Sequence, residues 1–301
     1  MKIFIFRFCN SITFYILKKL KEGIFIAFFF FVSCFSFTDI ELVQIAKKSF
    51  HKNLPGFSCI INKLQQDISR NKNVWGNIFE IETALFFNTC LKQNILGFNL
   101  DIFVFDHKGK DRIKINLDNK KITLVQTEFD VITNNYCVEA KSGVPNQYEK
   151  YERQFVKEQN MLEWFSVITR ELTNKTIKLT AIVDKRNKNM MLMFNGISTF
   201  GKNIYLKCNW INGKNKAPYL FLDEWHGLIN ILSGKKFCAS FKNKIEINSK
   251  TEQILNKYKF PYIHSLDLEN LKNTVFANFI NLNLLTQNDI NMLCPLEEYE
   301  I

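Results

Sequence analysis

The sequence predicts an α/β protein in which helices flank a mixed β-sheet. Two patterns support this prediction. Short segments alternate apolar and polar residues with the period of a strand, and longer segments repeat apolar residues every three or four positions, as a helix does. Most strand segments lie between residues 99 and 141, and helical segments lie on both sides of them. We therefore expect a central sheet with helical extensions before and after it.

Composition sets the protein class and limits the kinds of site. The 301 residues include 47% hydrophobic and 23% charged residues, which is typical of a globular protein and argues against a disordered chain. The net charge of +11 favours a polyanionic partner, either nucleic acid or an anionic membrane surface. A chain rich in Lys, Asn, Ile and Phe would carry this charge whatever its function, so the charge alone establishes neither partner. The eight cysteines form no Cys-x-x-Cys pair, which argues against a zinc site.

The first 38 residues differ from the rest. Lysines and an arginine precede the uncharged segment 23–37, which reads GIFIAFFFFVSCFSF. This length suits the apolar region of a signal peptide and is short for a membrane-spanning helix, which needs about twenty residues. We expect a signal peptide or membrane anchor over 1–38, with membrane attachment through 23–37 as one outcome. The rest of the chain would then be exported or membrane-anchored, on the periplasmic or extracellular side. Segment 31–34 is similar to a lipoprotein box, which would be lipidated at Cys34. For the apolar segment 23–37 as a whole, the alternative is a buried core helix.

Helical spacing continues after this segment. Helices are predicted over residues 39–51 and 59–69, with a break at Leu54-Pro55-Gly56, so that 39–73 forms a helical N-terminal extension. A further helix over 74–92 carries Glu80 and Glu82. Gly97 ends this helix, and a strand is expected over 99–105.

Charged residues interrupt the strands that follow. Strands are predicted over 113–117, 122–132 and 136–141, with Thr133-Asn134-Asn135 as the last turn. Strand periodicity places Glu128 and Asp130 on one face of the first strand beside the turn, and Glu139 and Lys141 on one face of the second. Clustered carboxylates repel one another unless a cation lies between them, and Mg²⁺ prefers such oxygen ligands. A nearby ammonium can orient a water or stabilise charge on a phosphate.

At these residues the sequence resembles the PD-(D/E)XK nuclease superfamily, which has the restriction-endonuclease-like fold. The signature is an Asp at the end of one strand and Glu-x-Lys on the next. Asp130, Glu139 and Lys141 occupy these positions, although Phe129 stands where the family name has Pro. The family also has a glutamate on an upstream helix. Segment 76–80, which reads GNIFE, is similar to that helix, so the resemblance assigns this role to Glu80, with Glu82 as the second choice.

The resemblance implies metal-dependent hydrolysis of nucleic-acid phosphodiester bonds, with DNA favoured. It implies that Mg²⁺ or Mn²⁺ is held by Asp130, Glu139 and Glu80, with Glu128 as an additional ligand, and that Lys141 positions the attacking water. A long helix is predicted over 146–172. The resemblance suggests that its polar residues contact the active site or the phosphate backbone; these are Gln147, Lys150, Arg153 and Gln154. A solvated helix face is the alternative for each of them.

The resemblance places the restriction-endonuclease-like core at 74–235 and a mostly helical extension at 236–301. Within the core, strands are predicted over 176–183 and 219–222, with a helix over 223–232. Two other functions stay open. One is a catalytically inactive exported protein that binds nucleic acid or a protein partner on the same fold. The other is an exported structural or interaction protein whose hairpin is solvated, with Glu128 and Lys141 as a cross-strand charge pair.

Overall fold

The computed structural model describes residues 39–70, 72, 74–142, 148–183, 189–195, 203–242 and 249–264. Contacts divide the chain into units 1–38 and 39–301, and all described residues lie in the second. The predicted signal peptide or anchor over 1–38, including 23–37 and Cys34, therefore lies outside the described residues, and so does Gln147. No helix in the described ranges combines the length and apolar character needed to cross a bilayer.

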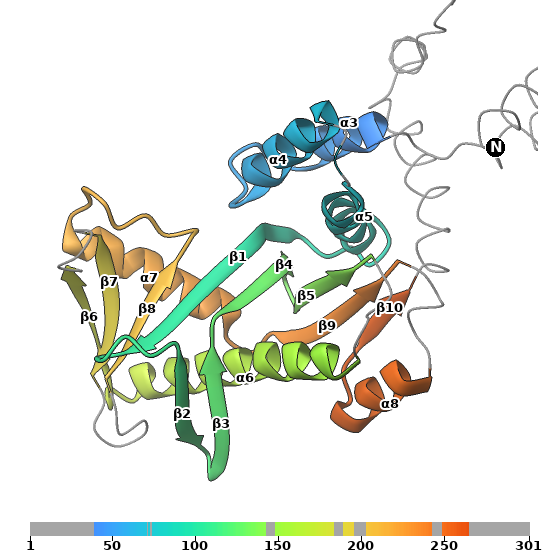
Figure 1. Cartoon of the computed structure of the whole chain (residues 1–301). Helices are drawn as coiled ribbons and strands as arrows, with labels where there is room; N and C mark the ends of the chain where they lie inside the picture. The colour runs from blue at the N-terminus through green and yellow to red at the C-terminus, as the bar shows by residue number, and fades with distance from the viewer. Residues whose placement is uncertain are drawn as a thin grey trace, which may run out of the picture. The chain divides into compact units, whose positions relative to one another are not determined.

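An eight-stranded mixed sheet forms the centre of the fold (Figure 1). In spatial order its strands are β10 (Tyr262–His264), β9 (Lys236–Phe241), β5 (Tyr136–Lys141), β4 (Thr127–Thr133), β1 (Ile95–Asp106), β8 (Ile204–Cys208), β7 (Met190–Asn195) and β6 (Lys178–Val183). A separate two-stranded sheet contains β2 (Arg112–Leu117) and β3 (Lys120–Val125). The predicted α/β class with a mixed sheet is confirmed.

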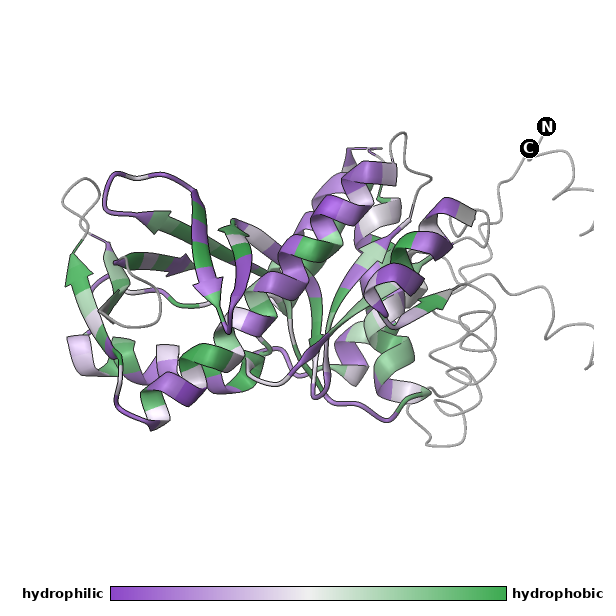
Figure 2. Ribbon diagram, turned by 90° about the horizontal axis from the view of Figure 1, so that it is seen from below, coloured by the Kyte–Doolittle hydropathy of each residue, from purple (hydrophilic) through white to green (hydrophobic). Residues whose placement is uncertain are grey.

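Helices cover the sheet on two sides. They are α3 (Asp39–Ser49), α4 (Phe57–Ser69), α5 (Trp75–Thr89), α6 (Tyr148–Thr173), α7 (Pro218–Leu232) and α8 (Ser249–Tyr258). Helix α5 packs on β1, β4 and β5, whereas α6 packs on β4, β9 and β3 from the other side (Figure 1). Seen from below, the outward side of α6 is mainly hydrophilic (Figure 2). The sheet region that carries the acidic residues is therefore enclosed between α5 and α6.

The sheet extends beyond residue 235, where the nuclease-like domain was predicted to end. Strand β9 pairs in parallel with β5 along its whole length, from Tyr136 opposite Lys236 to Lys141 opposite Phe241. Strand β10 then pairs in parallel with β9. The segment 236–241 reads KFCASF, and its Lys and Ala are depleted in strands, so little in these residues indicates that it pairs inside the sheet.

Two predicted strands were wrong. The single strand expected over 122–132 is interrupted at Gln126, because β3 pairs with β2 while β4 joins the large sheet. The strand expected over 219–222 is the first turn of α7, which begins at Pro218. Proline is favourable at the first helical position because its fixed φ suits the helix and its missing N–H is not needed there.

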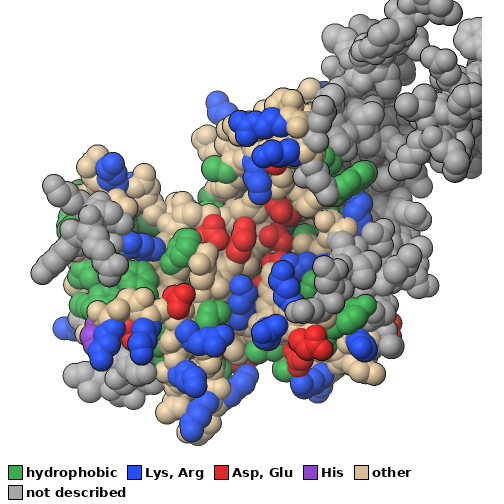
Figure 3. Space-filling model, viewed as in Figure 1, with side chains coloured by type: hydrophobic (Ala, Val, Ile, Leu, Met, Phe, Trp, Pro, Cys, Tyr) green, Lys and Arg blue, Asp and Glu red, His purple; other side chains and the backbone are tan. Residues whose placement is uncertain are grey.

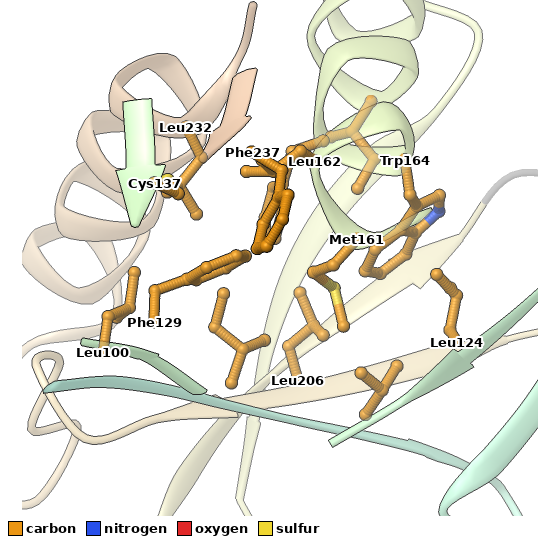
Figure 4. Close-up of a cluster of buried hydrophobic side chains, with 14 of the residues drawn as sticks. Leu100, Leu124, Phe129, Cys137, Met161, Leu162, Trp164, Leu206, Leu232 and Phe237 are labelled. Atoms are coloured by element: carbon orange, nitrogen blue, oxygen red, sulfur yellow. The ribbon is translucent and has the colours of Figure 1, made fainter. Parts of the chain in front are cut away.

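The apolar core joins the sheet to α6. Phe129 of β4, Leu162 of α6 and Phe237 of β9 meet between these elements (Figure 4), and each is 1% exposed or less. The small sheet contributes to the same core, because Ile113 and Leu124 face inward while the neighbouring Arg112 faces solvent. Burying a large apolar side chain contributes about 1.5–3 kcal/mol, so this core fixes α6 against the sheet.

A tight backbone contact joins α4 to β1. Gly56 precedes α4 with φ 75°, and a Cβ placed there would lie 1.9 Å from the carbonyl oxygen of Phe98. The adjacent N–H of Phe98 donates to the carbonyl of Pro55 at 2.9 Å. A residue with a side chain at position 56 therefore meets both a left-handed backbone and a steric clash.

We expect Gly56→Ala to lower the free energy of unfolding by about 2 kcal/mol or more, since it adds backbone strain and a clash with β1. Gly227→Ala is the matched control, because Gly227 lies within α7 and a Cβ there would meet nothing within 4 Å. The control should raise stability by up to about 1 kcal/mol. Urea denaturation of both variants measures the difference; equal stability of the two would contradict the described contact.

Candidate active site

Strands β4 and β5 separate just where the predicted acidic residues lie. They pair only beside their turn, at Val131 opposite Val138 and Ile132 opposite Cys137. Beyond this point the Asp130 carboxylate accepts a hydrogen bond of 2.7 Å from the backbone N–H of Ala140. The carboxylate thus satisfies a backbone donor that would otherwise pair with the neighbouring strand. Local chain separation is what opens space for side chains between the two strands.

Side-chain hydrogen bonds fix the turn between β4 and β5. The Thr133 hydroxyl accepts the N–H of Tyr136 at 2.9 Å and donates to Oε1 of Gln93 at 2.9 Å. The buried Lys235 ammonium donates to the carbonyls of Thr133 and Asn134 at 2.5 and 2.6 Å. Because the turn is held from two sides, the strands diverge from a fixed point and the acidic residues keep their positions.

Four elements contribute to one buried polar cluster. The members are Glu80 from α5, Asp130 from β4, Glu139 and Lys141 from β5, and Gln154 and Glu158 from α6. Nζ of Lys141 and Nε2 of Gln154 both donate to Oε1 of Glu139. Figure 3 shows acidic side chains gathered in a hollow in the middle of the molecule, with lysines and arginines below them.

Three carboxylates of this cluster are almost fully buried. Asp130 is 8% exposed, Glu139 3% and Glu158 0%. Within the described structure, Oε2 of Glu80, Oε2 of Glu139 and both carboxylate oxygens of Glu158 have no hydrogen-bond partner. Unpaired buried carboxylates are costly unless they take up a proton or a cation, so the cluster has unused capacity for a positive ligand.

The pKa values of the acidic residues reflect the cost of burying them close together. Burial raises the pKa of Asp130, and the charges of Glu139 and Glu80 raise it further. Burial raises the pKa of Glu80 to about 8, although the charge of Lys63 offsets part of this effect. Burial and the charge of Glu139 raise the pKa of Glu158 well above its ordinary value. The cluster therefore holds protons at neutral pH when no cation is bound.

Lys141 behaves differently. Burial alone would lower its pKa, but the charges of Glu139 and Asp130 overcome that effect and raise the pKa above the ordinary range of lysine. The ammonium thus stays protonated, and it can donate hydrogen bonds but cannot accept a proton. Its Nζ also lies 5.8 Å from the centre of the Tyr151 ring, which limits its movement.

The donor set fits a hard divalent cation that keeps part of its water shell. Among the described residues, no three His, Cys, Asp or Glu side chains are grouped so that they could hold a metal ion. Mg²⁺, however, is commonly bound by one or two carboxylates together with water and substrate phosphates. Asp130 and Glu139 supply two carboxylates, and the unpaired Oε2 of Glu139 is free to bind a cation.

The other predicted residues occupy distinct places. Glu82 forms an ion pair with Lys242 at 3.6 Å, so Glu80, and not Glu82, joins the cluster. Glu128 is exposed at the margin, where its charge raises the pKa values of Glu80 and Glu139. Lys150 and Arg153 are exposed on α6 outside the cluster. The solvated hairpin with a Glu128–Lys141 pair is not found, because Lys141 contacts the buried Glu139 instead.

Sequence reasoning missed Glu158. The apolar stripe of α6 runs through Tyr151, Phe155, Leu162 and Phe165, and the helical spacing requires an inward residue between 155 and 162. Glu158 occupies that inward position. A glutamate at an apolar stripe position was the available signal, and it follows Gln154 by one helical turn on the same side.

No protein-family model, curated protein or solved structure matches this chain. The chemistry and placement of the chain's own residues are therefore the basis for inferring its function.

We expect the free energy of unfolding, measured by urea denaturation with a chelator, to fall between pH 5 and pH 8. The unfolded chain loses its carboxyl protons near pH 4 to 4.5, whereas in the folded chain burial raises the pKa of Glu80 to about 8 and also raises the pKa values of Asp130 and Glu158. Stability conferred by these protons is complete below the unfolded pKa and is lost as pH rises through the folded one. One such group contributes about 1.4 kcal/mol per pH unit.

Glu158→Gln should reduce this slope, because glutamine resembles the protonated side chain and cannot titrate. Glu149→Gln is the matched control, since Glu149 is exposed on the same helix. Addition of Mg²⁺ or Mn²⁺ should restore stability at pH 8, because a cation that binds only the folded state stabilises it. An unchanged slope in Glu158→Gln would refute the role assigned to its burial.

Proposed function

We propose that this protein is a metal-dependent nuclease of the PD-(D/E)XK type that hydrolyses phosphodiester bonds of nucleic acid, with DNA favoured. The observation that carries the proposal is the meeting of Asp130, Glu139 and Lys141 where β4 and β5 separate. A solvated hairpin would not bury two carboxylates beside an ammonium. Such burial costs desolvation free energy, and buried groups with strongly shifted pKa values are concentrated at functional sites.

The order of elements supports the same proposal. Helix α5 carries Glu80, β4 carries Asp130, β5 carries Glu139 and Lys141, and the long helix α6 follows. This is the order that the resemblance implies. The fold itself is α/β with a mixed sheet, and a restriction-endonuclease-like core within it is part of the proposal.

Asp130 and Glu139 would hold Mg²⁺ or Mn²⁺, with Glu80 assisting from α5. When bound, such an ion polarises the phosphate and makes a nearby water a stronger nucleophile. The donor set described above fits this ion because the carboxylates repel one another without a positive charge between them. Cation binding would thus relieve the strain shown by their raised pKa values.

The chain's own residues supply the remaining chemistry. Lys141 stays protonated, so it donates a hydrogen bond to the attacking water or to a phosphate oxygen that gains charge. Gln154 donates to Glu139 and thereby keeps that carboxylate oriented. Glu158 is fully buried and close enough to Glu139 for their charges to interact, so it influences the protonation of the cluster without contact with solvent.

A nucleic-acid-binding protein without cleavage is the second candidate. The observation that favours it is the missing group of three metal-binding side chains among the described residues. Export, membrane attachment through 23–37 and lipidation at Cys34 remain predictions under either candidate, since those positions lie outside the described residues.

We expect the full chain to cut plasmid, linear or single-stranded DNA, or RNA, only with Mg²⁺ or Mn²⁺. Asp130→Asn keeps an oxygen for the Ala140 N–H but removes the charge, and it should lower the cleavage rate at least about 100-fold. Lys141→Ala should cause a similar loss. Gel assays of initial rates measure these effects, and Glu82→Gln is the control, because Glu82 pairs with Lys242 outside the cluster.

Two results would contradict the nuclease proposal. One is a folded wild-type protein that cuts no substrate and binds no metal in calorimetry. The other is cleavage that persists in Asp130→Asn and Lys141→Ala, which would indicate a contaminating nuclease. Binding of nucleic acid without cleavage would favour the second candidate.

A further inference from the structure

A basic groove of about 1010 Å³ lies beside the acidic cluster. The β2–β3 hairpin forms one wall, α6 forms the floor, and residues 258–261, at the end of α8 and just after it, form the opposite wall. Eight of its twenty lining residues are lysine or arginine, and one, Glu163, is acidic. Blue side chains over α6 and the hairpin mark this region in Figure 3. Such an excess of one charge in a concave surface attracts an extended polyanion.

The cations come from both walls and the floor. The hairpin contributes Arg112, Lys120 and Lys121; α6 contributes Lys150, Arg153 and Lys157; Lys236 and Lys259 lie at the opposite side. Lys120 pairs with Glu163 at 3.0 Å. Within the described residues, Arg112, Lys121, Lys150 and Arg153 form no ion pair with a carboxylate, so their charge is available to a ligand.

The groove continues directly into the acidic cluster. Gln154 lines the groove and donates to Glu139. Lys157 also lines it, donates to the carbonyl of Gln126 at 3.3 Å, and lowers the pKa of Glu139 through its charge. The groove therefore borders the cluster at Gln154 and Lys157.

The β2–β3 hairpin is held in place by packing against the core. Its inward residues Ile115, Ile122 and Leu124 are at most 4% exposed and belong to the core that includes α6. An isolated two-stranded hairpin is marginally stable in water, so this packing is what holds it. Cations on a fixed wall are already placed for binding, which reduces the loss of entropy when a ligand is bound.

We propose that this groove binds several consecutive phosphates of a nucleic-acid strand and guides the strand to the acidic cluster, with the β2–β3 hairpin as a binding wall. The identification of the ligand as a nucleic acid rests on the proposed function. A nucleic acid is favoured over an anionic membrane because opposing walls can contact a strand from two sides. A flat bilayer would reach only the rims of such a concave site.

Binding is measured on the full chain in the presence of a chelator, so that no cleavage is needed for the result. Fluorescence anisotropy follows labelled single-stranded DNA, duplex DNA and RNA between about 50 and 200 mM salt. The groove variant is Arg112→Ala, Lys121→Ala, Lys150→Ala and Arg153→Ala combined. The control removes the same charge elsewhere through Lys47→Ala, Lys52→Ala, Lys178→Ala and Lys214→Ala, which change exposed residues outside the groove.

We expect the groove variant to bind at least about 10-fold more weakly than the control. The slope of log Kd against log salt concentration should decrease by about 0.7–0.9 for each phosphate that the groove variant no longer neutralises. Circular dichroism of both variants verifies that they are folded. A second groove variant, Lys121→Ala with Arg153→Ala, gives the answer if the fourfold change disturbs folding.

Three outcomes would overturn this inference. One is equal binding by the groove variant and the wild type, and another is equal weakening by the control, which would show that net charge alone matters. The third is groove-dependent binding of phosphatidylserine vesicles with no binding of nucleic acid. Groove-dependent binding without metal-dependent cleavage would instead reject only the nuclease activity, so the two failures are distinguishable.

Discussion

The separation of β4 from β5 is the constraint on which the site depends. Two residue pairs hold the strands together beside the turn, and the Asp130 carboxylate then takes the place of a backbone partner for Ala140. In a continuous antiparallel pair, this N–H would be used by the opposite strand and no space would open. The gap is stable because β5 keeps a full set of partners on its other side, where β9 runs parallel to it.

This arrangement requires the burial of like charges. Asp130, Glu139 and Glu158 lie close to the ammonium of Lys141, and Glu80 lies close to Asp130. An apolar core of this size provides the stability that allows such a cluster to persist. Functional sites commonly combine local instability with a well-packed surrounding structure. In this cluster, repulsion among the buried carboxylates favours the binding of a cation.

Sequence patterns were most informative where one physical preference dominated. The three-and-four spacing of aromatic residues indicated α6, which the described residues show over Tyr148–Thr173, and strand alternation located β5 at 136–141. The same alternation placed Glu139 and Lys141 on one face, and the resemblance selected Asp130 to join them. These features are local, so the order of residues along the chain was sufficient to find them.

Long-range features were not available from the same patterns. Nothing in KFCASF indicates that 236–241 pairs with β5, because β5 is one hundred residues earlier. The break at Gln126 depends on β3 finding β2 instead of continuing into β4. Glu158 was visible as an exception within the apolar stripe, but its nearness to Glu139 arises only when α6 packs across the sheet.

The parallel pairing of β5 with β9 also sets the order of events during synthesis. Until residues 236–241 have been made, β5 is an edge strand whose backbone groups have no partner on that side. Pairing across such a distance in the chain is slow because a long loop must close first. Glu139 and Lys141 of β5 therefore reach their final positions late. A nascent chain that ends before β9 contains both residues but lacks the strand that pairs with β5.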